Sequence, residues 1–335
     1  MWKNKLTVDR TDWLLEYSNP SVRYWALKGL LDLGEDHPSV VAARDMIMES
    51  PIVTAILGAM NPEGYWENAD DMYLPKYTAT THQLLLLAEL GARRTPEIEK
   101  AVEHLFRFQR NSGHFLTDMP KTERGRDSAV KDGCCLDGNV LYYLIHFGYM
   151  DDPRTQRTLD FQVEYHDDEN AGWRCRAYPI DPNRVFPVNC YMGAAKVLKA
   201  LSIIPEERRS PEIRRVILRE AGNLMDNNVY QYLRNPDGSR KDKAGWKRFG
   251  FPLFYQTDVL EILDTLTRLG VRDPRMKPSI DMLLDTQQGD GTWLLKHTFN
   301  GKMIVDIEDK HKPSKWITLR AMRVLKRYYS RSSFA

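Results

Sequence analysis

The feature that most constrains this chain is an alternation of two kinds of helical segment along nearly its whole length. The more polar segments often begin with Ser, Thr or Asp followed by Pro, a strong helix start because the cap side chain accepts a bond from an otherwise unpaired N–H and Pro suits the first helical position. Strand-type alternation is almost absent. The apolar segments with helical periodicity are predicted at 20–33, 77–91, 135–148, 189–202, 254–269 and 314–329.

With a short helix near residues 10–17, these segments make six polar–apolar pairs and predict an all-α fold, an (α/α)6 toroid. Six inner apolar helices would form a ring covered by six outer helices, within a single domain over residues 1–335. Each long loop returns to the N-terminus of an inner helix, so we expect these loops to gather at one end, called the mouth. Long irregular loops usually carry function, which places the expected site there. These loops are predicted at 110–132, 166–187, 229–252 and 289–313.

The loops contain a second repeat. Residues 287–293 include Gln-x3-Gly-x-Trp, residues 109–115 repeat it with Phe for Trp, and residues 60–66 repeat it without the Gln. Shortened copies occur at 171–173 and 244–246. We expect the Gln to tie the end of an outer helix to the next turn, the Gly to supply a positive φ, and the aromatic ring to pack under the loop. These repeats are predicted to stabilise the fold without acting in catalysis.

The repeats resemble those of the terpenoid cyclases and protein prenyltransferases, and the resemblance extends from about residue 19 to residue 329. It implies an α/α toroid and an enzyme that acts on an isoprenoid or other apolar substrate with an anionic head in the central cavity, by cyclisation or by transfer to a nucleophile. The Asp-x-Asp-Asp motif of class II cyclases is absent, and its nearest counterpart is the string 306–309. The Asp-x-Cys zinc motif of the prenyltransferases is also absent.

Cysteines suggest a metal site. Cys135 and Cys190 lie at the starts of inner helices and Cys175 follows the turn at 171–173, so the three thiols are expected in one quarter of the mouth. Helix N-termini lower the pKa of a thiol, and thiolates bind zinc. Three protein ligands with an open fourth position are typical of a catalytic zinc. Cys134 is expected to point elsewhere. The alternatives are a reactive thiol without metal and simple packing, since cysteine is often buried.

Basic and aromatic residues near the mouth predict a ligand with two parts. Inner-helix N-termini directed at one region create a positive potential that attracts anions. An apolar tail would then enter a channel lined by aromatic side chains. The predicted substrate-binding residues are Arg23, Tyr24, His82, Arg174, Arg176, Tyr191, Arg248, Gln256, Lys315 and Trp316.

Acidic residues near inner-helix starts are the candidates for proton transfer. Asp258 and Tyr255 are spaced as neighbours on one face of the predicted helix at 254–269, so they form a candidate acid–hydroxyl pair. Asp306 and Glu308 lie in the last long loop and are further catalytic candidates, with a salt-bridged loop as the alternative.

Composition restricts the remaining possibilities. The 335 residues carry a formal net charge of +2 with both signs interspersed, which predicts no nucleic-acid partner. No apolar stretch is long enough to span a bilayer or act as a signal peptide, so we expect a cytoplasmic protein. Two alternatives to a cyclase-like or transferase-like enzyme are a non-catalytic toroid that binds a protein partner and a carbohydrate-active (α/α)6 enzyme. The sequence does not indicate an oligomeric state.

Overall fold

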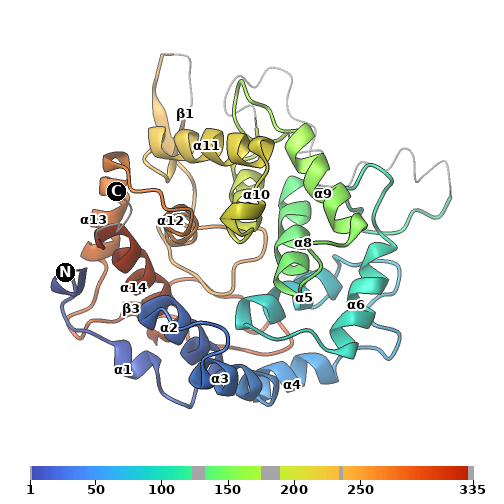
Figure 1. Ribbon diagram of the computed structural model, residues 1–335, viewed down its shortest axis with the longest axis horizontal. Coiled ribbons are helices and arrows are strands. Elements are labelled where there is room, and N and C mark those ends of the chain that lie inside the picture. The colour runs from blue at the N-terminus through green and yellow to red at the C-terminus, as the bar shows by residue number, and fades with distance from the viewer. Residues whose placement is uncertain (1, 123–132, 175–188, 234–236, 331–335) are drawn as a thin grey trace.

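A computed structural model describes residues 2–122, 133–174, 189–233 and 237–330 (Figure 1). Within these ranges the chain is helical apart from loops and two short antiparallel strand pairs. The pairs join β1 (Gln231–Leu233) to β2 (Arg240–Asp242) and β3 (Trp293–Leu294) to β4 (Pro313–Ser314). The predicted all-α class is confirmed.

The inner ring follows chain order. Helix α2 packs on α14, α14 on α12, α12 on α10, α10 on α8 and α8 on α5. The ring closes where the Trp25 indole N–H of α2 donates a 2.9 Å bond to the Glu89 carbonyl of α5. This arrangement, visible in Figure 1, is the predicted toroid. Its inner helices are α2 (Pro20–Leu31), α5 (Thr80–Leu90), α8 (Cys134–His146), α10 (Tyr191–Ser202), α12 (Val259–Arg268) and α14 (Lys315–Tyr329).

The outer helices begin where the cap signals predicted. The side chains of Thr95, Asp152 and Ser210 each accept a bond from a backbone N–H of the helix that follows. The last outer helix differs, because Asp273 caps a 3-10 turn and the helix itself begins at Lys277 without a side-chain cap. The second pair differs from the prediction, because its outer segment is split into two helices by Ser50-Pro51. The outer helices are α3 (Pro38–Met48), α4 (Pro51–Gly58), α6 (Pro96–Phe106), α9 (Pro153–Glu164), α11 (Pro211–Asp226) and α13 (Lys277–Asp285).

Shorter elements complete the outer layer. The 3-10 helix η1 (Trp2–Lys5) and the short helix α1 (Thr11–Leu14) both contact α14, at the place of a sixth outer helix. Two more 3-10 turns, η2 (Glu206–Arg208) and η3 (Pro274–Met276), precede outer helices. Within the described ranges, no helix combines the length and the hydropathy that a membrane span requires.

The repeated loop motif fastens the loops to the outer helices. The Gln109 amide donates to the carbonyl of Arg154 (2.7 Å) and to Thr158 Oγ1 (2.8 Å), which joins the end of α6 to α9. Gly113 has φ +101°, and a Cβ there would overlap the Arg157 carbonyl, so glycine is required. The indole N–H groups of Trp66, Trp173 and Trp293 donate to carbonyls of the preceding outer helices α4, α9 and α13.

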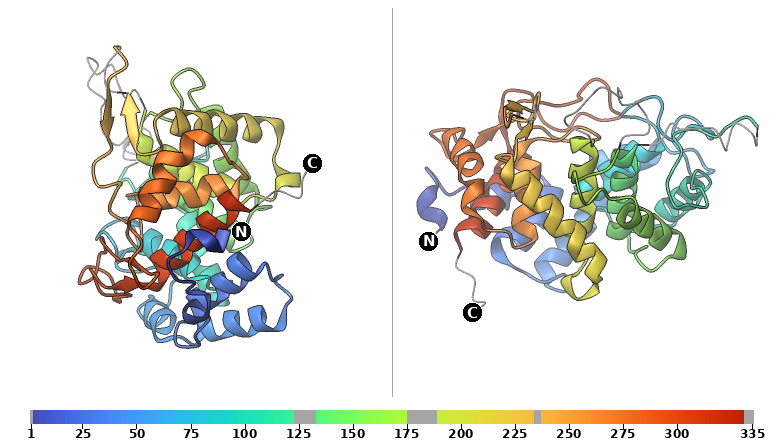
Figure 2. Two further views of the ribbon diagram at one scale, coloured as in Figure 1. Left: turned by 90° about the vertical axis from the view of Figure 1, so that its left-hand side faces the viewer. Right: turned by 90° about the horizontal axis from the view of Figure 1, so that it is seen from above.

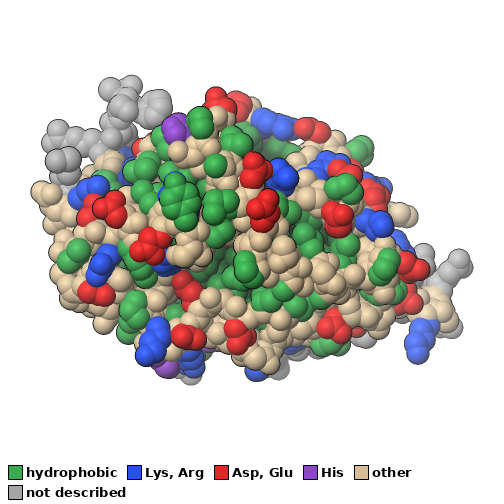
Figure 3. Space-filling view, turned by 90° about the horizontal axis from the view of Figure 1, so that it is seen from below, with side chains coloured by type: hydrophobic (Ala, Val, Ile, Leu, Met, Phe, Trp, Pro, Cys, Tyr) green, Lys and Arg blue, Asp and Glu red, His purple; other side chains and the backbone are tan. Residues whose placement is uncertain are grey.

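The long loops gather along one end of the helical ring, as the chain order predicted (Figure 2, right). The face in Figure 3 mixes acidic and basic side chains without a block of one sign.

Candidate functional site at the mouth of the toroid

Loops from distant parts of the chain interlock at the mouth. The backbone N–H of Phe251, in the loop before α12, donates to the His297 carbonyl in the last long loop (3.2 Å). Asn139 of α8 donates its amide to the Phe254 carbonyl (3.1 Å). The Gln256 amide reaches the Tyr77 hydroxyl at 3.4 Å. The loops before α5, α12 and α14 thus meet over the N-terminal ends of α5 and α8.

His82 lies at the centre of this meeting point. Its ring centroid is 5.0 Å from that of Tyr73, 5.8 Å from Tyr77 and 5.2 Å from Phe254. Phe299 stacks on Tyr77 with centroids 4.3 Å apart. Burial among these rings, with a smaller effect of the Lys76 charge, lowers the pKa of His82 to about 3, so its imidazole is neutral. These rings with Gln83, Gln256 and Thr257 are called the mouth cluster below.

The mouth cluster contains four polar atoms for which the described residues provide no partner. Nδ1 of His82, Oε1 of Gln83, Oε1 of Gln256 and Oγ1 of Thr257 are each buried and have no hydrogen-bond partner in the part of the chain that the structure describes. The first two residues follow one another at the start of α5, and the second two precede α12. Because an unsatisfied buried polar group costs free energy, such a concentration indicates a place where a ligand completes the bonding.

Of the predicted catalytic residues, Asp258 has a structural role. Its Oδ1 accepts the Glu261 N–H and its Oδ2 the Gly250 N–H, both at 2.8 Å. Burial raises its pKa to about 6. Because this cap starts α12 at Val259, Tyr255 lies in the preceding loop, and the prediction that the two side chains share one helical face is wrong. Tyr255 does lie at the mouth, where the Lys76 amine is 5.1 Å from its ring centroid.

The other acidic candidates hold the loop before α14. Asp306 accepts the Gly301 N–H at 2.8 Å, and Glu308 accepts the Lys315 N–H at 2.8 Å and bonds to the Ser314 hydroxyl. Burial raises the pKa of the Glu308 carboxyl. Within the described ranges these contacts are hydrogen bonds that hold the loop, and neither carboxylate forms an ion pair of the kind that the salt-bridged alternative requires.

The predicted basic residues do not form one rim. The Arg23 guanidinium lies 4.0 Å from the Tyr17 ring centroid, and the Lys315 amine is 2.6 Å from a carboxylate oxygen of Glu16, so both cations are engaged near α1. Arg174 and Arg248 are exposed. Arg176 lies outside the described residues.

Nor do the predicted aromatic side chains line a single channel. Tyr24 donates its hydroxyl to the Glu35 carboxylate (3.1 Å), at the short turn after α2. Trp316 stacks on Phe251 at 4.1 Å, and Tyr191 borders a separate pocket beside α10. The prediction of one aromatic channel is wrong because these rings serve three different regions.

The ring centre below the mouth holds ion pairs that the sequence analysis missed. Lys199 bonds to Glu261 Oε1 at 2.8 Å and to Glu89, and Arg320 bonds to Glu89 Oε2 at 2.6 Å. Lys196 is 2.7 Å from Glu261 Oε2. A second group surrounds Asp264, whose carboxylate meets Arg268, Arg323 and Arg327 at 2.8–3.1 Å. These residues are called the central ion-pair network.

Coulombic pairing outweighs burial in this network. Burial alone would raise the pKa of Glu261, but Lys196 and Lys199 hold it well below its usual range. The cavity among these side chains measures about 30 Å³, so at this depth the ring does not accommodate an apolar tail.

The sequence contains a signal for this network. Lys196 and Lys199 are three residues apart on an apolar helix, as are Glu261 and Asp264, and both pairs point inward.

The cysteines lie where α8 and α10 approach closely. A Cβ on Gly193 would overlap the sulfur of Cys134, so Cys134 faces the first turn of α10. The Cys190 sulfur accepts the Gly193 N–H at 3.4 Å. Cys135 is half-buried at the start of α8, and Cys175 lies outside the described residues. Among the residues that are described, no cluster of three metal-ligating side chains occurs, so the three-thiol site stays a prediction.

No protein-family model matches the sequence, and no curated protein matches it. Solved structures of similar fold include a protein from Actinoplanes, with 14% identity, a TM-score of 0.43, and coverage of 93% of this chain and 90% of that chain. They also include the type II terpene cyclase MstE from Scytonema, with 13% identity, a TM-score of 0.42, and coverage of 92% and 86%. A variant of that cyclase in complex with geranylgeranyl dihydroxybenzoate has a TM-score of 0.43 at 13% identity, with coverage of 93% and 86%.

Proposed function

We propose that the protein is an enzyme of the cyclase or prenyl-transfer type that binds an apolar substrate with an anionic head at the mouth cluster. The observation that carries this proposal is the buried His82, neutral and without a partner at Nδ1 among the described residues, enclosed by aromatic rings where inner helices begin. A structural histidine at this depth normally has a hydrogen-bond partner.

The positive charge below the mouth favours a substrate with an anionic head. In the central ion-pair network, six cations (Lys196, Lys199, Arg268, Arg320, Arg323, Arg327) face three carboxylates (Glu89, Glu261, Asp264), an excess of three formal positive charges. The N-termini of α5 and α8 add to this potential. The exposed Lys76, whose amine lies 5.9 Å from the ring centroid of Tyr73, supplies a further cation at the entrance.

The mouth cluster suits chemistry that develops positive charge on carbon. Aromatic faces attract a cation, and the rings of Tyr73, Tyr77 and Phe254 surround one point. A neutral imidazole beside that point accepts a proton when the cation is discharged. We assign this role to His82, with Gln256 and Thr257 orienting the substrate.

Zinc is the proposed metal. Cys135 and Cys190 stand at the N-terminal ends of α8 and α10, which pack closely at Gly138 and Gly193, and Cys175 would complete the ligand set. A bound zinc would supply Lewis-acid chemistry or activate a thiol or water. Elemental analysis should find about one zinc per chain, and Cys135→Ser, Cys175→Ser and Cys190→Ser should each release it. Full metal content in all three variants would refute the assignment.

Calorimetry with farnesyl diphosphate, farnesol and inorganic diphosphate tests the substrate class. We expect the diphosphate ester to bind at least about tenfold more tightly than the alcohol at low salt, because its head forms charge-assisted bonds that salt weakens. His82→Phe and Lys76→Met should weaken binding of the ester. Lys5→Met, an exposed lysine near Tyr329 and away from the mouth, is the matched control.

Two outcomes would contradict the proposal. If none of the three compounds binds, the anion-attracting mouth is wrong, and a non-catalytic toroid that presents its surface to a protein partner becomes the better explanation. If farnesol binds as tightly as farnesyl diphosphate at low salt, the head has no role.

A further inference from the structure

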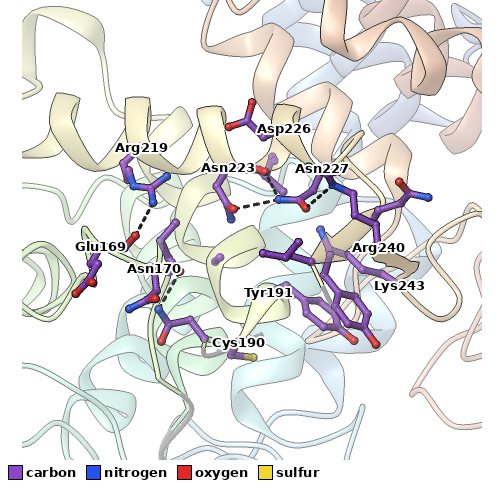
Figure 4. Close-up of a pocket in the computed structure, with 18 residues that line it drawn as sticks. Glu169, Asn170, Cys190, Tyr191, Arg219, Asn223, Asp226, Asn227, Arg240 and Lys243 are labelled. Atoms are coloured by element: carbon purple, nitrogen blue, oxygen red, sulfur yellow. Dashed lines mark hydrogen bonds between the residues drawn. The ribbon is translucent and has the colours of Figure 1, made fainter. Parts of the chain in front are cut away.

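A second candidate site lies on the side of the ring, away from the mouth cluster. A pocket of about 340 Å³ opens between the first turn of α10, the C-terminal half of α11, the turn at 169–172 and the β1–β2 hairpin (Figure 4). Its volume falls in the range of small-molecule sites. Of the residues that line this pocket, the proposed function uses Cys190 alone, as a zinc ligand.

Three cations line the pocket without a carboxylate partner among the described residues. Within the part of the chain that the structure describes, neither Arg219, Arg240 nor Lys243 forms an ion pair. Arg219 donates to the backbone carbonyls of Asp168 (2.7 Å) and Glu169 (2.8 Å), and Figure 4 shows the second of these bonds. Arg240 donates to the Asn227 amide oxygen (3.3 Å).

Lys243 is the deepest of these cations. It follows β2, its side chain is 4% exposed, and its amine donates to the Val229 carbonyl at 3.0 Å. The amine also lies 4.0 Å from the Trp246 ring centroid and 5.5 Å from that of Tyr191. Burial, opposed by the charge of Glu220, lowers the pKa of Lys243 to about 7. A buried lysine without a carboxylate partner costs free energy that an anionic ligand would recover.

One wall of the pocket is aromatic. The rings of Tyr191 and Tyr232 stack with centroids 5.7 Å apart and planes 12° from parallel. Both side chains are half-buried, so part of each ring faces the pocket. A flat ligand can extend this stack.

The acidic groups of the pocket lie at its rim. Glu169 and Asp226 are exposed, and the Asp226 carboxylate is held by Arg275 at 2.5 Å. The interior instead offers amides, including Asn189, whose buried Oδ1 has no hydrogen-bond partner among the described residues. A neutral sugar would leave the cations uncompensated, whereas an anion with one additional donor satisfies both the cations and Asn189.

We propose that this pocket binds a planar organic anion, an aromatic or conjugated carboxylate, with its ring against Tyr191 and Tyr232 and its carboxylate beside Lys243 and Arg240. The aromatic wall and the unpaired cations lie on adjoining sides of the same pocket, and a flat carboxylate contacts both at once.

To test this inference, the binding of 2-naphthoate, 2-naphthalenemethanol and acetate is measured by calorimetry and by ligand-observed NMR. The naphthoate should bind at least about tenfold more tightly than the neutral alcohol, and acetate should bind more weakly than both, because charge and ring are needed together. Phenyl phosphate in a parallel titration distinguishes a carboxylate site from a general anion site. Equal binding of naphthoate and its alcohol would overturn the proposal, as would tighter binding of the phosphate.

Variants locate the site. Lys243→Met should reduce naphthoate affinity about tenfold or more and leave the alcohol unchanged, and Tyr232→Leu should weaken both ligands. Lys241→Met, an exposed lysine of β2 outside the pocket lining, is the matched control and should change neither. If Lys243→Met unfolds, Arg240→Gln at the exposed rim gives the same test with a smaller loss. Unchanged naphthoate affinity in these variants would refute the assignment, and binding of farnesyl diphosphate at the mouth should be unaffected by all of them.

Discussion

The ring centre and the mouth differ in how their buried polar groups are satisfied. In the central ion-pair network, Glu89 and Glu261 are matched by Lys196, Lys199 and Arg320. In the mouth cluster, one layer above, polar atoms of similar burial have no partner among the described residues. The carboxylates of the centre are therefore compensated by neighbouring cations without a ligand, whereas the polar atoms of the mouth cluster are not.

The difference separates two uses of a buried polar residue. Paired charges in a ring of apolar helices recover part of their desolvation cost from one another and fix how the helices face. Unpartnered groups keep their cost in the empty protein and recover it when a ligand binds. Substitutions should therefore affect stability in the first region and binding in the second.

The largest expected effect belongs to the centre. Glu261→Gln leaves Lys196 and Lys199 short of a carboxylate in a buried site, which typically costs about 3–5 kcal/mol of unfolding free energy. Urea denaturation followed by circular dichroism measures this change. Glu16→Gln, which removes an exposed partner of Lys315, is the control and should cost less than about 1 kcal/mol. A loss below about 1 kcal/mol for Glu261→Gln would remove the distinction between the two regions.

A second effect compares two buried lysines. Burial lowers the pKa of Lys199, but Glu261 and Glu89 raise it above its usual range, whereas Lys243 falls to about 7 from an ordinary value of 10.5. Between pH 7 and pH 10.5, the two pKa values of Lys243 in the folded and unfolded chain, the unfolded chain binds more protons at Lys243 than the folded protein does. The stability of the wild type should therefore rise with pH across this window, by at most about 1.4 kcal/mol per pH unit.

The Lys243→Met variant should lack this increase of stability with pH. Measured between pH 7.5 and pH 9, the wild type should gain about 2 kcal/mol relative to Lys243→Met, because Met carries no titrating group. Lys241→Met should follow the wild type. A parallel pH dependence in the wild type and Lys243→Met would show that Lys243 is already compensated by a charge in the folded protein.

The sequence predicted the fold well because helical periodicity and cap residues act locally. Pro after Ser, Thr or Asp started three outer helices where expected. The site was harder to predict, since it depends on which faces meet across the ring. Asp258 appeared catalytic from its position, but its contacts with two backbone N–H groups are visible only when the loop at Gly250 is in place.

The central network shows the same limit. Glu89 and Arg320 are 231 residues apart in sequence and meet only because the ring closes. Their helices were correctly predicted as inner, and their charges could have been recognised as inward-facing from the apolar residues on either side. The choice of partner, however, depends on the order of helices around the ring.

The smallest expected effect on stability belongs to the mouth. His82→Phe removes a neutral ring whose Nδ1 has no partner among the described residues and should change the unfolding free energy by less than about 1 kcal/mol at pH 7. Tyr143→Phe is the matched comparison, because the Tyr143 hydroxyl is buried and lies 3.2 Å from Thr81 Oγ1. Its removal should cost about 1–2 kcal/mol, since Thr81 then loses a partner.

Binding reverses the order of these two variants. His82→Phe should weaken farnesyl diphosphate binding at the mouth, whereas Tyr143→Phe, which lies outside the mouth cluster, should not. Calorimetry on both variants at matched folded fraction separates the two readouts. If His82→Phe proves as destabilising as Tyr143→Phe and binds the ligand normally, then the imidazole is part of the structural core, and the mouth is satisfied in the same way as the centre.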